Sequence, residues 1–195
     1  MSKVNTHMTM SLDGFIADPH DGIDELFGWY GAGDIEVPTA VDQFTFMVDE
    51  PGAELLRGLM GNVGALVAGR RIFDITNGWD DHHPMGAPVV VVTHHAPEDA
   101  DRWPRTSFAG SVEAGVERAK EIAGDQDVTI VSADIAAQAL DLGLVDEVDV
   151  SLVPVLLGEG IPYFASLGAA PHRFEDPIVT PGTRATHLQY TVKRD

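Results

Sequence analysis

Two adjacent arginines stand at a position where a phosphate group could bind. In the stretch AGRRIFD, Gly69 ends a short apolar run, and Arg70 and Arg71 begin a short helical stretch. The free N–H groups and the dipole at the start of a helix attract anions, and arginine stays charged at physiological pH. The pattern predicts a phosphate site, and the alternative is a plain strand-to-helix turn whose arginines are solvated.

A second set of hydrogen-bonding side chains follows the next apolar run. The stretch VVTHHAP ends in Thr93, His94 and His95, where a strand meets the edge of its sheet. A zinc site would need these histidines to join His82 and His83, but the four have no fixed ligand spacing. We therefore expect ordinary loop histidines beside a ligand, and no metal.

Composition excludes several classes of chemistry. The chain has no cysteine, which rules out thiolate nucleophiles and cysteine-bound metals, and no G-x-S-x-G hydrolase motif occurs. The net charge is -19, from 31 acidic against 12 basic residues, so a nucleic-acid partner is not expected. No apolar run is long enough to cross a bilayer, and the N-terminus does not resemble a signal peptide. The sequence predicts a soluble, cytoplasmic protein without a membrane partner.

The elements that would position these side chains alternate between strands and helices. Short valine-rich runs are typical of parallel strands covered on both faces, and they are followed by helices with one apolar face. Helix starts are indicated by Asp49 or Glu50 with Pro51, and by Ser111. The predicted strands cover 3–12, 63–69, 88–93, 128–131 and 145–158, and the predicted helices begin near 50, 111 and 133, the last two ending at Gly124 and Gly143.

Two further segments complete the expected fold. Residues 18–48 are rich in turn signals, and a loop of that length inside a compact domain is commonly functional. The tail, from about His172 to Val192, indicates a strand pair around TPGT. Together the patterns predict one α/β domain over residues 1–195, with three layers (αβα) and a mixed, mainly parallel sheet closed by an antiparallel C-terminal edge. Ligands bind such sheets near the carboxyl ends of the strands.

Four stretches resemble one known family. These are MSLDGFIA, AGRRIFD, VVVVTHHAP and ALDLGLVDEVDVSLVPVLLGEGIPYF, and they resemble the reductase domain of the bacterial bifunctional riboflavin deaminase-reductases and its stand-alone relatives. The resemblance spans nearly the whole chain and implies a dihydrofolate reductase-like fold. It also implies an NADPH-dependent reductase that transfers hydride to a C=N or C=O carbon of a small molecule. The zinc motifs of the deaminase domain are absent from the sequence.

The resemblance also implies roles for individual residues. Asp13 and Gly14 would form a bend after the first strand, and Ile16 and Ala17 would meet the nicotinamide. Gly69, Arg70 and Arg71 would hold cofactor phosphates, with Thr93 and His94 near the 2'-phosphate and Ser132, Ala133, Asp134 and Ile135 along the pyrophosphate. Asp13 is our candidate proton donor, because partial burial would raise its pKa; the alternative is that it only fixes the turn.

This chain departs from the relatives at two places. Ser132 and Ala133 stand where relatives carry two glycines, and Asp134 would either cap its helix or repel an incoming anion. Residues 13–56 contain no lysine or arginine, although the riboflavin intermediate 5-amino-6-ribosylaminouracil phosphate carries a phosphate. A non-catalytic nucleotide-binding or structural paralogue is therefore the alternative function.

Two expectations concern the substrate and the assembly. Trp29, Tyr30 and Phe44 are candidates for a substrate wall, and as aromatic residues they are equally credible as core beneath the long segment. Apolar residues in VDVSLVPVLLG exceed what one covered strand face needs, and the family resemblance suggests a homodimer.

Overall fold

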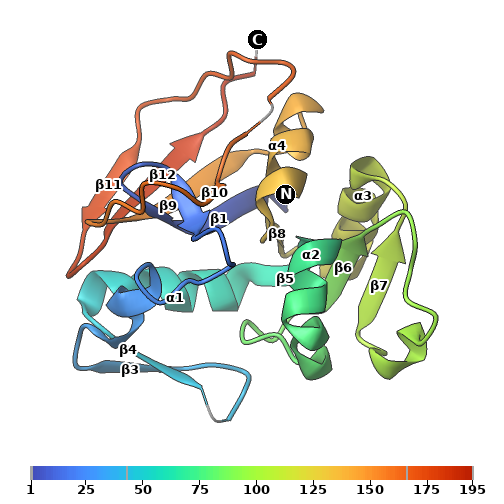
Figure 1. The fold of residues 1–195 in the computed structure, drawn as a ribbon, viewed down its shortest axis with the longest axis horizontal. Coiled ribbons are helices and arrows are strands. Elements are labelled where there is room, and N and C mark those ends of the chain that lie inside the picture. The colour runs from blue at the N-terminus through green and yellow to red at the C-terminus, as the bar shows by residue number, and fades with distance from the viewer. Residues whose placement is uncertain (1, 43, 166, 195) are drawn as a thin grey trace.

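A single mixed β-sheet organises the chain (Figure 1). The computed structural model describes residues 2–42, 44–165 and 167–194. Six neighbouring strands are parallel, and the last two strands of the chain continue the sheet antiparallel at one edge. In spatial order they are β11 (Ile178–Pro181), β12 (Thr186–Thr191), β9 (Glu147–Val153), β1 (Val4–Ser11), β8 (Asp127–Ile130), β5 (Val63–Gly69), β6 (Val89–Val92) and β7 (Thr106–Ala109).

Helices cover both faces of this sheet. On one face lie α1 (Glu50–Asn62) and α2 (Arg70–Ile75), and on the other lie α3 (Val112–Ala123) and α4 (Ala133–Asp141). The starts follow the sequence signals, because the Asp49 carboxylate accepts from the N–H of Gly52 and the Ser111 hydroxyl accepts from the N–H of Ala114. The predicted three-layer, mainly parallel fold is therefore confirmed.

The core divides between the two faces because β5 is buried on both. Ala65 and Val67 pack with the helices α3 and α4, whereas Leu66 and Ala68 pack with Phe73 of α2. Alternate residues of a strand point to opposite faces, so a continuous apolar run is what such a central strand requires. This is why the run Val63–Gly69 was recognisable from the sequence.

The long segment before α1 contains more regular structure than expected. It holds a short 3-10 helix at Phe27–Gly31 and a hairpin of β3 (Ile35–Pro38) and β4 (Thr45–Val48). The hairpin strands have four residues each, too few for a clear alternation, and their inward side chains Val37, Phe46 and Val48 are buried in a cluster with α1. A small second pair joins β2 (Phe15–Ala17) to β10 (Ile161–Pro162).

A left-handed turn follows α2. All five residues of Asn77–Asp81 have positive φ, between 50° and 65°, although only Gly78 is a glycine. This conformation costs L-residues about 1–2 kcal/mol each, so neighbouring contacts must hold it. The Trp103 indole donates to the carbonyl of Asn77 at 2.9 Å, and the Asp81 carboxylate accepts from the N–H of Arg105. A further short 3-10 turn lies at Ala100–Arg102.

Within the described residues, no helix is long and apolar enough to cross a membrane.

Candidate functional site

The carboxyl ends of the parallel strands meet at one edge of the sheet, and the predicted phosphate residues lie there. Gly69 ends β5 and Ser132 follows β8, and these two strands pair directly. A methyl group placed on Gly69 would come 2.8 Å from the Ser132 hydroxyl oxygen. The structure therefore brings the starts of α2 and α4 side by side, as the predicted arrangement requires.

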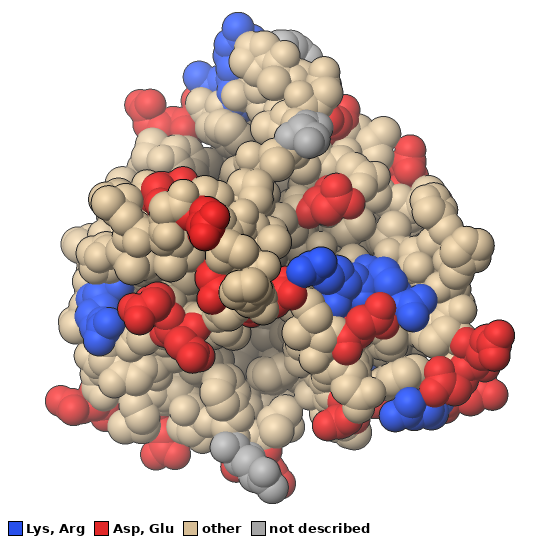
Figure 2. Space-filling view, in the orientation of Figure 1, with Lys and Arg blue, Asp and Glu red and all other residues tan. Residues whose placement is uncertain are grey.

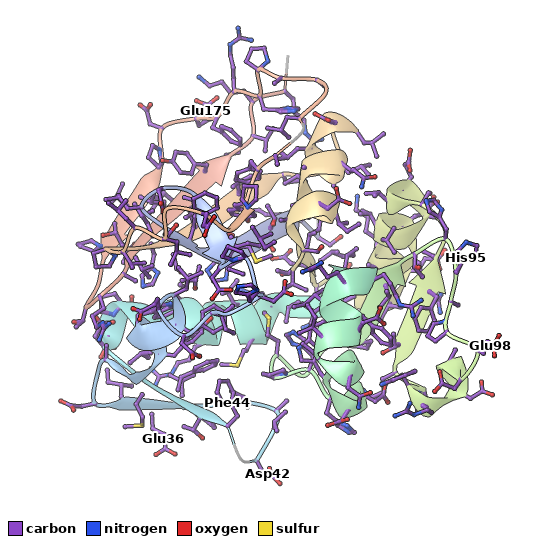
Figure 3. All side chains as sticks on the ribbon, viewed as in Figure 1. Glu36, Asp42, Phe44, His95, Glu98 and Glu175 are labelled. Atoms are coloured by element: carbon purple, nitrogen blue, oxygen red, sulfur yellow. The ribbon has the colours of Figure 1, made fainter. Side chains whose placement is uncertain are left out.

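Arg70 connects this edge to the loop after β6. Its Nε donates to the Asp74 carboxylate at 2.7 Å, and its Nη1 donates to the carbonyl of His95, also at 2.7 Å. The Thr93 hydroxyl donates to the same carbonyl at 3.1 Å. Arg70 and Thr93 thus lie at one place. His94 is exposed on the same loop, next to His95, which is labelled in Figure 3.

Arg71 is held by an acid that the sequence analysis missed. Its Nε and Nη2 donate to the two carboxylate oxygens of Asp21, at 3.0 Å and 2.7 Å. This bidentate pair ties α2 to the segment after β2, and Figure 2 shows the basic side chains of this face lying directly beside acidic ones. A phosphate at Arg71 would have to replace Asp21.

Asp13 fastens the turn after β1 to the segment before β10. Its carboxylate accepts from the Ser11 hydroxyl at 2.6 Å and from the N–H groups of Leu157 and Gly158 at 3.1 Å and 2.7 Å. The N–H of Tyr163 donates to the carbonyl of Gly14 in the same region. The predicted bend at Asp13 and Gly14 is confirmed.

The expected raised pKa of Asp13 is wrong. Hydrogen bonds from the Ser11 hydroxyl and from the N–H groups of Gly158 and Leu157 lower the pKa of this carboxyl, and its side chain is exposed. Asp13 is therefore an ionised acceptor near neutral pH. This is the turn-fixing alternative, and we do not propose Asp13 as a proton donor.

The start of α4 offers main-chain donors. Ser132 is its N-cap residue, and among the described residues its side chain makes no capping hydrogen bond. Asp134 does not cap either, because its carboxylate is exposed and accepts from Gln138 at 2.8 Å, one turn further along. The side chain of Ile135 is 4% exposed and belongs to the core, so only its main chain could contribute to a pyrophosphate site. Ala133 is half-buried beside it.

Ile16 and Ala17 are only partly available to a ligand. Both belong to β2, and Ala17 pairs with Ile161 of β10. The Ala17 side chain is 8% exposed, and Ile16 packs at the border of the main core. The two residues form a small ribbon attached to the turn at Asp13.

The three aromatic candidates occupy different environments. Trp29 is 2% exposed, and its indole donates to the Thr9 hydroxyl at 3.1 Å, so its assignment to a substrate wall is wrong. Tyr30 packs against Trp29 and Phe46, and burial raises its pKa to about 12. Phe44 is 42% exposed beside the β3–β4 hairpin (Figure 3). Trp29 therefore supports the hairpin from within.

The histidines do not form a metal site in the part of the chain that the structure describes, where no group of three or more suitable ligands occurs. His83 packs edge-on against Trp79, and burial lowers its pKa to about 4. His82 directly follows the left-handed turn, and its Nδ1 contacts the carbonyl of Asp80 at 3.1 Å.

The sequence analysis also missed a group of buried and half-buried polar side chains. On one face of β1 and its neighbours lie Asn5, His7, Asp149, Ser151 and His187. The signal was present in the first strand, VNTHMTMS, where every second residue from Asn5 onward is polar. Its alternation indicated a strand with one polar face, but not that a helix would cover that face.

Comparison with known proteins shows the family to which this chain belongs. The sequence profile of the RibD C-terminal domain matches residues 2–177. A search of curated proteins found no match. A solved Shewanella sp. PV-4 protein, assigned provisionally to riboflavin biosynthesis, is 24% identical, with a TM-score of 0.68 and coverage of 98% of this chain and 99% of the other.

Two further structures share the fold. The Thermotoga maritima diaminohydroxyphosphoribosylaminopyrimidine deaminase/5-amino-6-(5-phosphoribosylamino)uracil reductase is 16% identical with a TM-score of 0.66, and the match covers 98% of this chain but 57% of that longer one. Dihydrofolate reductase from Enterococcus faecalis, solved with NADP(H), is 12% identical with a TM-score of 0.59, covering 98% and 97% of the two chains. These likenesses show the fold.

Proposed function

Because this chain belongs to the RibD C-terminal domain family, we propose that it is an NADPH-dependent reductase that transfers hydride to a C=N or C=O carbon of a small molecule. The family and its fold support a reductase related to the riboflavin pathway. NADPH, the acceptor group and the residue roles below are our proposal.

One observation carries the proposal. Arg70, Thr93 and Ser132, which come from three separate parts of the chain, lie at the same edge of the sheet. Arg70 supplies a permanent positive charge, Thr93 a hydroxyl, and the start of α4 supplies N–H groups that its N-cap side chain does not occupy. These donors suit a ligand with several phosphates, and NADPH has three.

The cofactor, when bound, supplies the hydride, so the protein's task is to bind, orient and exclude water. In our proposal Arg70 and the start of α4 hold the phosphates, while the ribbon of β2 and β10 lies over the reacting end. Asp13 keeps that ribbon in place through the N–H groups of Leu157 and Gly158. A fixed ribbon positions Ile16 and Ala17 without requiring either to react.

The chemical class of the substrate is inferred from a structural neighbour and from the charges near the ribbon of β2 and β10. The Thermotoga protein acts on 5-amino-6-(5-phosphoribosylamino)uracil, so a related ring is our first candidate acceptor. Residues 13–56, which include the ribbon strand β2 and the start of α1, contain no lysine or arginine. We therefore propose an acceptor without a phosphoribosyl group.

Cofactor binding is the first test. NADPH and NADH would be titrated separately while tryptophan fluorescence is followed. We expect saturable binding of NADPH, weakened about tenfold or more in Arg70→Ala through loss of a charged hydrogen-bonding partner. Arg118→Ala is the matched control, because Arg118 also pairs with an acid on its own helix but lies on α3. Absence of saturable binding with both cofactors would exclude the reductase.

Turnover is the second test. A panel of carbonyl and imine compounds, including the uracil substrate of the Thermotoga protein and its dephosphorylated form, would be screened by NADPH oxidation. Oxidation with any member supports the reductase. NADPH binding without oxidation across the panel would instead favour the non-catalytic nucleotide-binding paralogue.

We also propose that the chain forms a homodimer. The outer strand β11 exposes 64% of Ile178 and 54% of Val179, and exposed apolar residues on an edge strand are commonly covered by pairing. Sedimentation at micromolar concentration would measure the mass, and a species of 20.9 kDa alone would contradict the dimer.

A further inference from the structure

The face of the sheet beneath α1 is polar across four strands. Paired residues of neighbouring strands point to the same side, so their side chains form continuous rows. Such a face, covered by a helix, is normally apolar. The residues of this polar face are Asp127 and Thr129 of β8, Asn5 and His7 of β1, Glu147, Asp149 and Ser151 of β9, and His187 and Gln189 of β12.

A cavity of about 300 Å³ lies between this polar face and α1. Helix α1 contributes Leu55 and Leu59, and β11 contributes Ile178, so the pocket has apolar walls above a polar floor. Its floor includes Lys3 and Asn5, at the amino end of β1, whereas the proposed cofactor edge lies at the carboxyl ends of the strands. The pocket is therefore separate from the cofactor site.

Three buried polar atoms at this pocket lack a hydrogen-bond partner among the described residues. They are Oδ1 of Asn5, Oδ1 of Asp149 and Nε2 of His187, and the three residues are 7%, 6% and 6% exposed. Unsatisfied polar atoms in a folded interior cost free energy, so they are uncommon without a ligand or water. Two of the three, the oxygens of Asn5 and Asp149, are acceptors, which calls for a donor.

The charges around the pocket also favour a ligand that is a hydrogen-bond donor and carries positive charge. Three of the elements that surround it contribute acids: α1 contributes Glu54, β8 contributes Asp127, and β9 contributes Glu147 and Asp149. Lys3 is the only lysine or arginine among the described lining residues, and its Nζ already donates to Glu147 at 2.5 Å. The pocket thus has a surplus of negative charge.

The two histidines do not offset that surplus. His7 and His187 contact the Ser151 hydroxyl from opposite sides, at 3.0 Å and 2.9 Å. Burial lowers the pKa of His7 to about 4 and lowers that of His187 as well, so both imidazoles are neutral near pH 7. The His7–Ser151–His187 chain supplies shape and hydrogen bonds rather than positive charge.

We propose that this pocket binds a small organic cation with a planar amidinium or guanidinium group, directed at Asp149 and Asn5, and an apolar body against Leu55 and Leu59. A planar group with several N–H donors matches adjacent acceptor oxygens better than a spherical ion does. The described residues hold no cluster suited to a metal. This site is independent of the reductase proposal.

Asp149 links cation binding to pH. Burial and the nearby Glu147 raise its pKa to about 7, so a substantial fraction is protonated at neutral pH. A bound cation favours the ionised form and lowers that pKa. Binding should therefore release protons near pH 7, and affinity should rise as pH increases from 6 to 8.

The experiment uses benzamidine as the probe and neutral benzamide, which has nearly the same shape, as its ligand control. Calorimetric titration of the full chain should show benzamidine binding at one site per chain, at least about tenfold tighter than benzamide. Asp149→Asn keeps the side-chain shape and should weaken benzamidine about tenfold or more. Asp125→Asn, an exposed residue beyond α3, makes the same change in net charge and should leave affinity unchanged.

Two further readouts distinguish binding in this pocket from a general effect of charge and from binding at the cofactor edge. Titrations in buffers of different ionisation enthalpy should detect proton release near pH 7 that disappears in Asp149→Asn, and saturating NADPH should not displace benzamidine. Equal binding of benzamidine and benzamide, or equal affinities of the two variants, would overturn the proposal. So would an Asp149→Asn variant that changes dimerisation but not benzamidine binding, because a second copy would then be the occupant.

If Asp149→Asn fails to fold, Asn5→Leu removes the second acceptor and provides the same comparison. Benzamidine affinity unchanged in that folded variant would count against the site.

Discussion

The Asp13 carboxylate holds the turn after β1 against the main chain before β10. Its hydrogen bonds to Ser11, Leu157 and Gly158 favour the ionised form and lower its pKa in the folded state. A lowered folded pKa gives stability that is present above the unfolded pKa and is lost as pH falls through the folded one. Asp13 should therefore stabilise the fold at neutral pH and stop doing so in strong acid.

Replacing Asp13 by Asn tests this directly. We expect Asp13→Asn to lower the melting temperature at pH 7. The difference from wild type should shrink as pH falls below about 4, and it should disappear once the folded wild-type carboxyl is also protonated. The pH profile of NADPH oxidation between pH 6 and 8 should keep its shape. A new or lost ionisation in that profile would mean that Asp13 does take part in proton transfer.

In the proposed cofactor site, Asp21 would compete with a phosphate group for Arg71. Because Asp21 accepts from Nε and Nη2 of that guanidinium, Asp21→Asn should free it and tighten NADPH binding by up to about fivefold, the range of an exposed ion pair. Fluorescence titration at fixed ionic strength measures the effect, with Asp125→Asn as a control for net charge. Equal tightening in both variants would show a general charge effect and not release of Arg71.

The sequence predicted the positions of some residues of the candidate site and missed others. The position of Arg70, Thr93 and Ser132 at one edge of the sheet could be predicted, because each follows a buried strand and parallel strands end at one edge. Asp21 was missed because fifty positions separate it from Arg71, and no local pattern records a contact at that separation. Trp29 was ambiguous because an aromatic ring suits a ligand wall and a core equally well.

At the scale of elements, the ribbon of β2 and β10 depends on one glycine. Gly160 has φ of +157°, and an added methyl group would come 2.2 Å from the carbonyl oxygen of Ala17. Gly160→Ala should therefore separate the two short strands, destabilise the protein by roughly 1–3 kcal/mol and weaken NADPH binding. Chemical denaturation and cofactor titration measure these effects.

Gly110→Ala is the matched control for this substitution. Gly110 has open space around its methyl position and no positive φ, so we expect little change. If Gly160→Ala binds NADPH as wild type does, the ribbon does not contribute to the cofactor site.

Elements with strong patterns were predictable, and short ones were not. The buried run Val63–Gly69 and the helix capped by Ser111 were recognised within a residue or two, because composition and capping both specify them. The hairpin of β3 and β4 was hidden within a segment rich in turn signals, since its burial is determined by α1, which comes later in the chain. Tertiary packing therefore decided what local sequence could not.

At the scale of the whole molecule, the net charge of -19 opposes an anionic cofactor. Added salt screens this long-range repulsion, so the association rate of NADPH should increase between about 0.01 M and 0.15 M ionic strength. The dissociation rate should increase as well, because the same salt weakens the contact with Arg70. Stopped-flow fluorescence separates the two rates.

NADH provides the comparison for this salt effect. It lacks the 2'-phosphate, so its association rate should rise less over the same range of salt. An association rate that falls with salt for NADPH would show that the local arginines outweigh the charge of the whole protein.

The left-handed turn after α2 also contains a site of slow deamidation. It contains an Asn-Gly pair, Asn77 and Gly78, and such pairs lose the side-chain amide when the next main-chain nitrogen attacks it. Here the Asn77 amide donates to Asp80 at 2.6 Å, and the Trp103 indole holds the Asn77 carbonyl. Deamidation should therefore be slow in the folded protein and fast in a peptide covering residues 74–82. Trp103→Phe removes the indole and should speed deamidation of Asn77 in the stored protein, which mass spectrometry can follow. Equal deamidation rates in the protein and the peptide would show that the turn gives no protection.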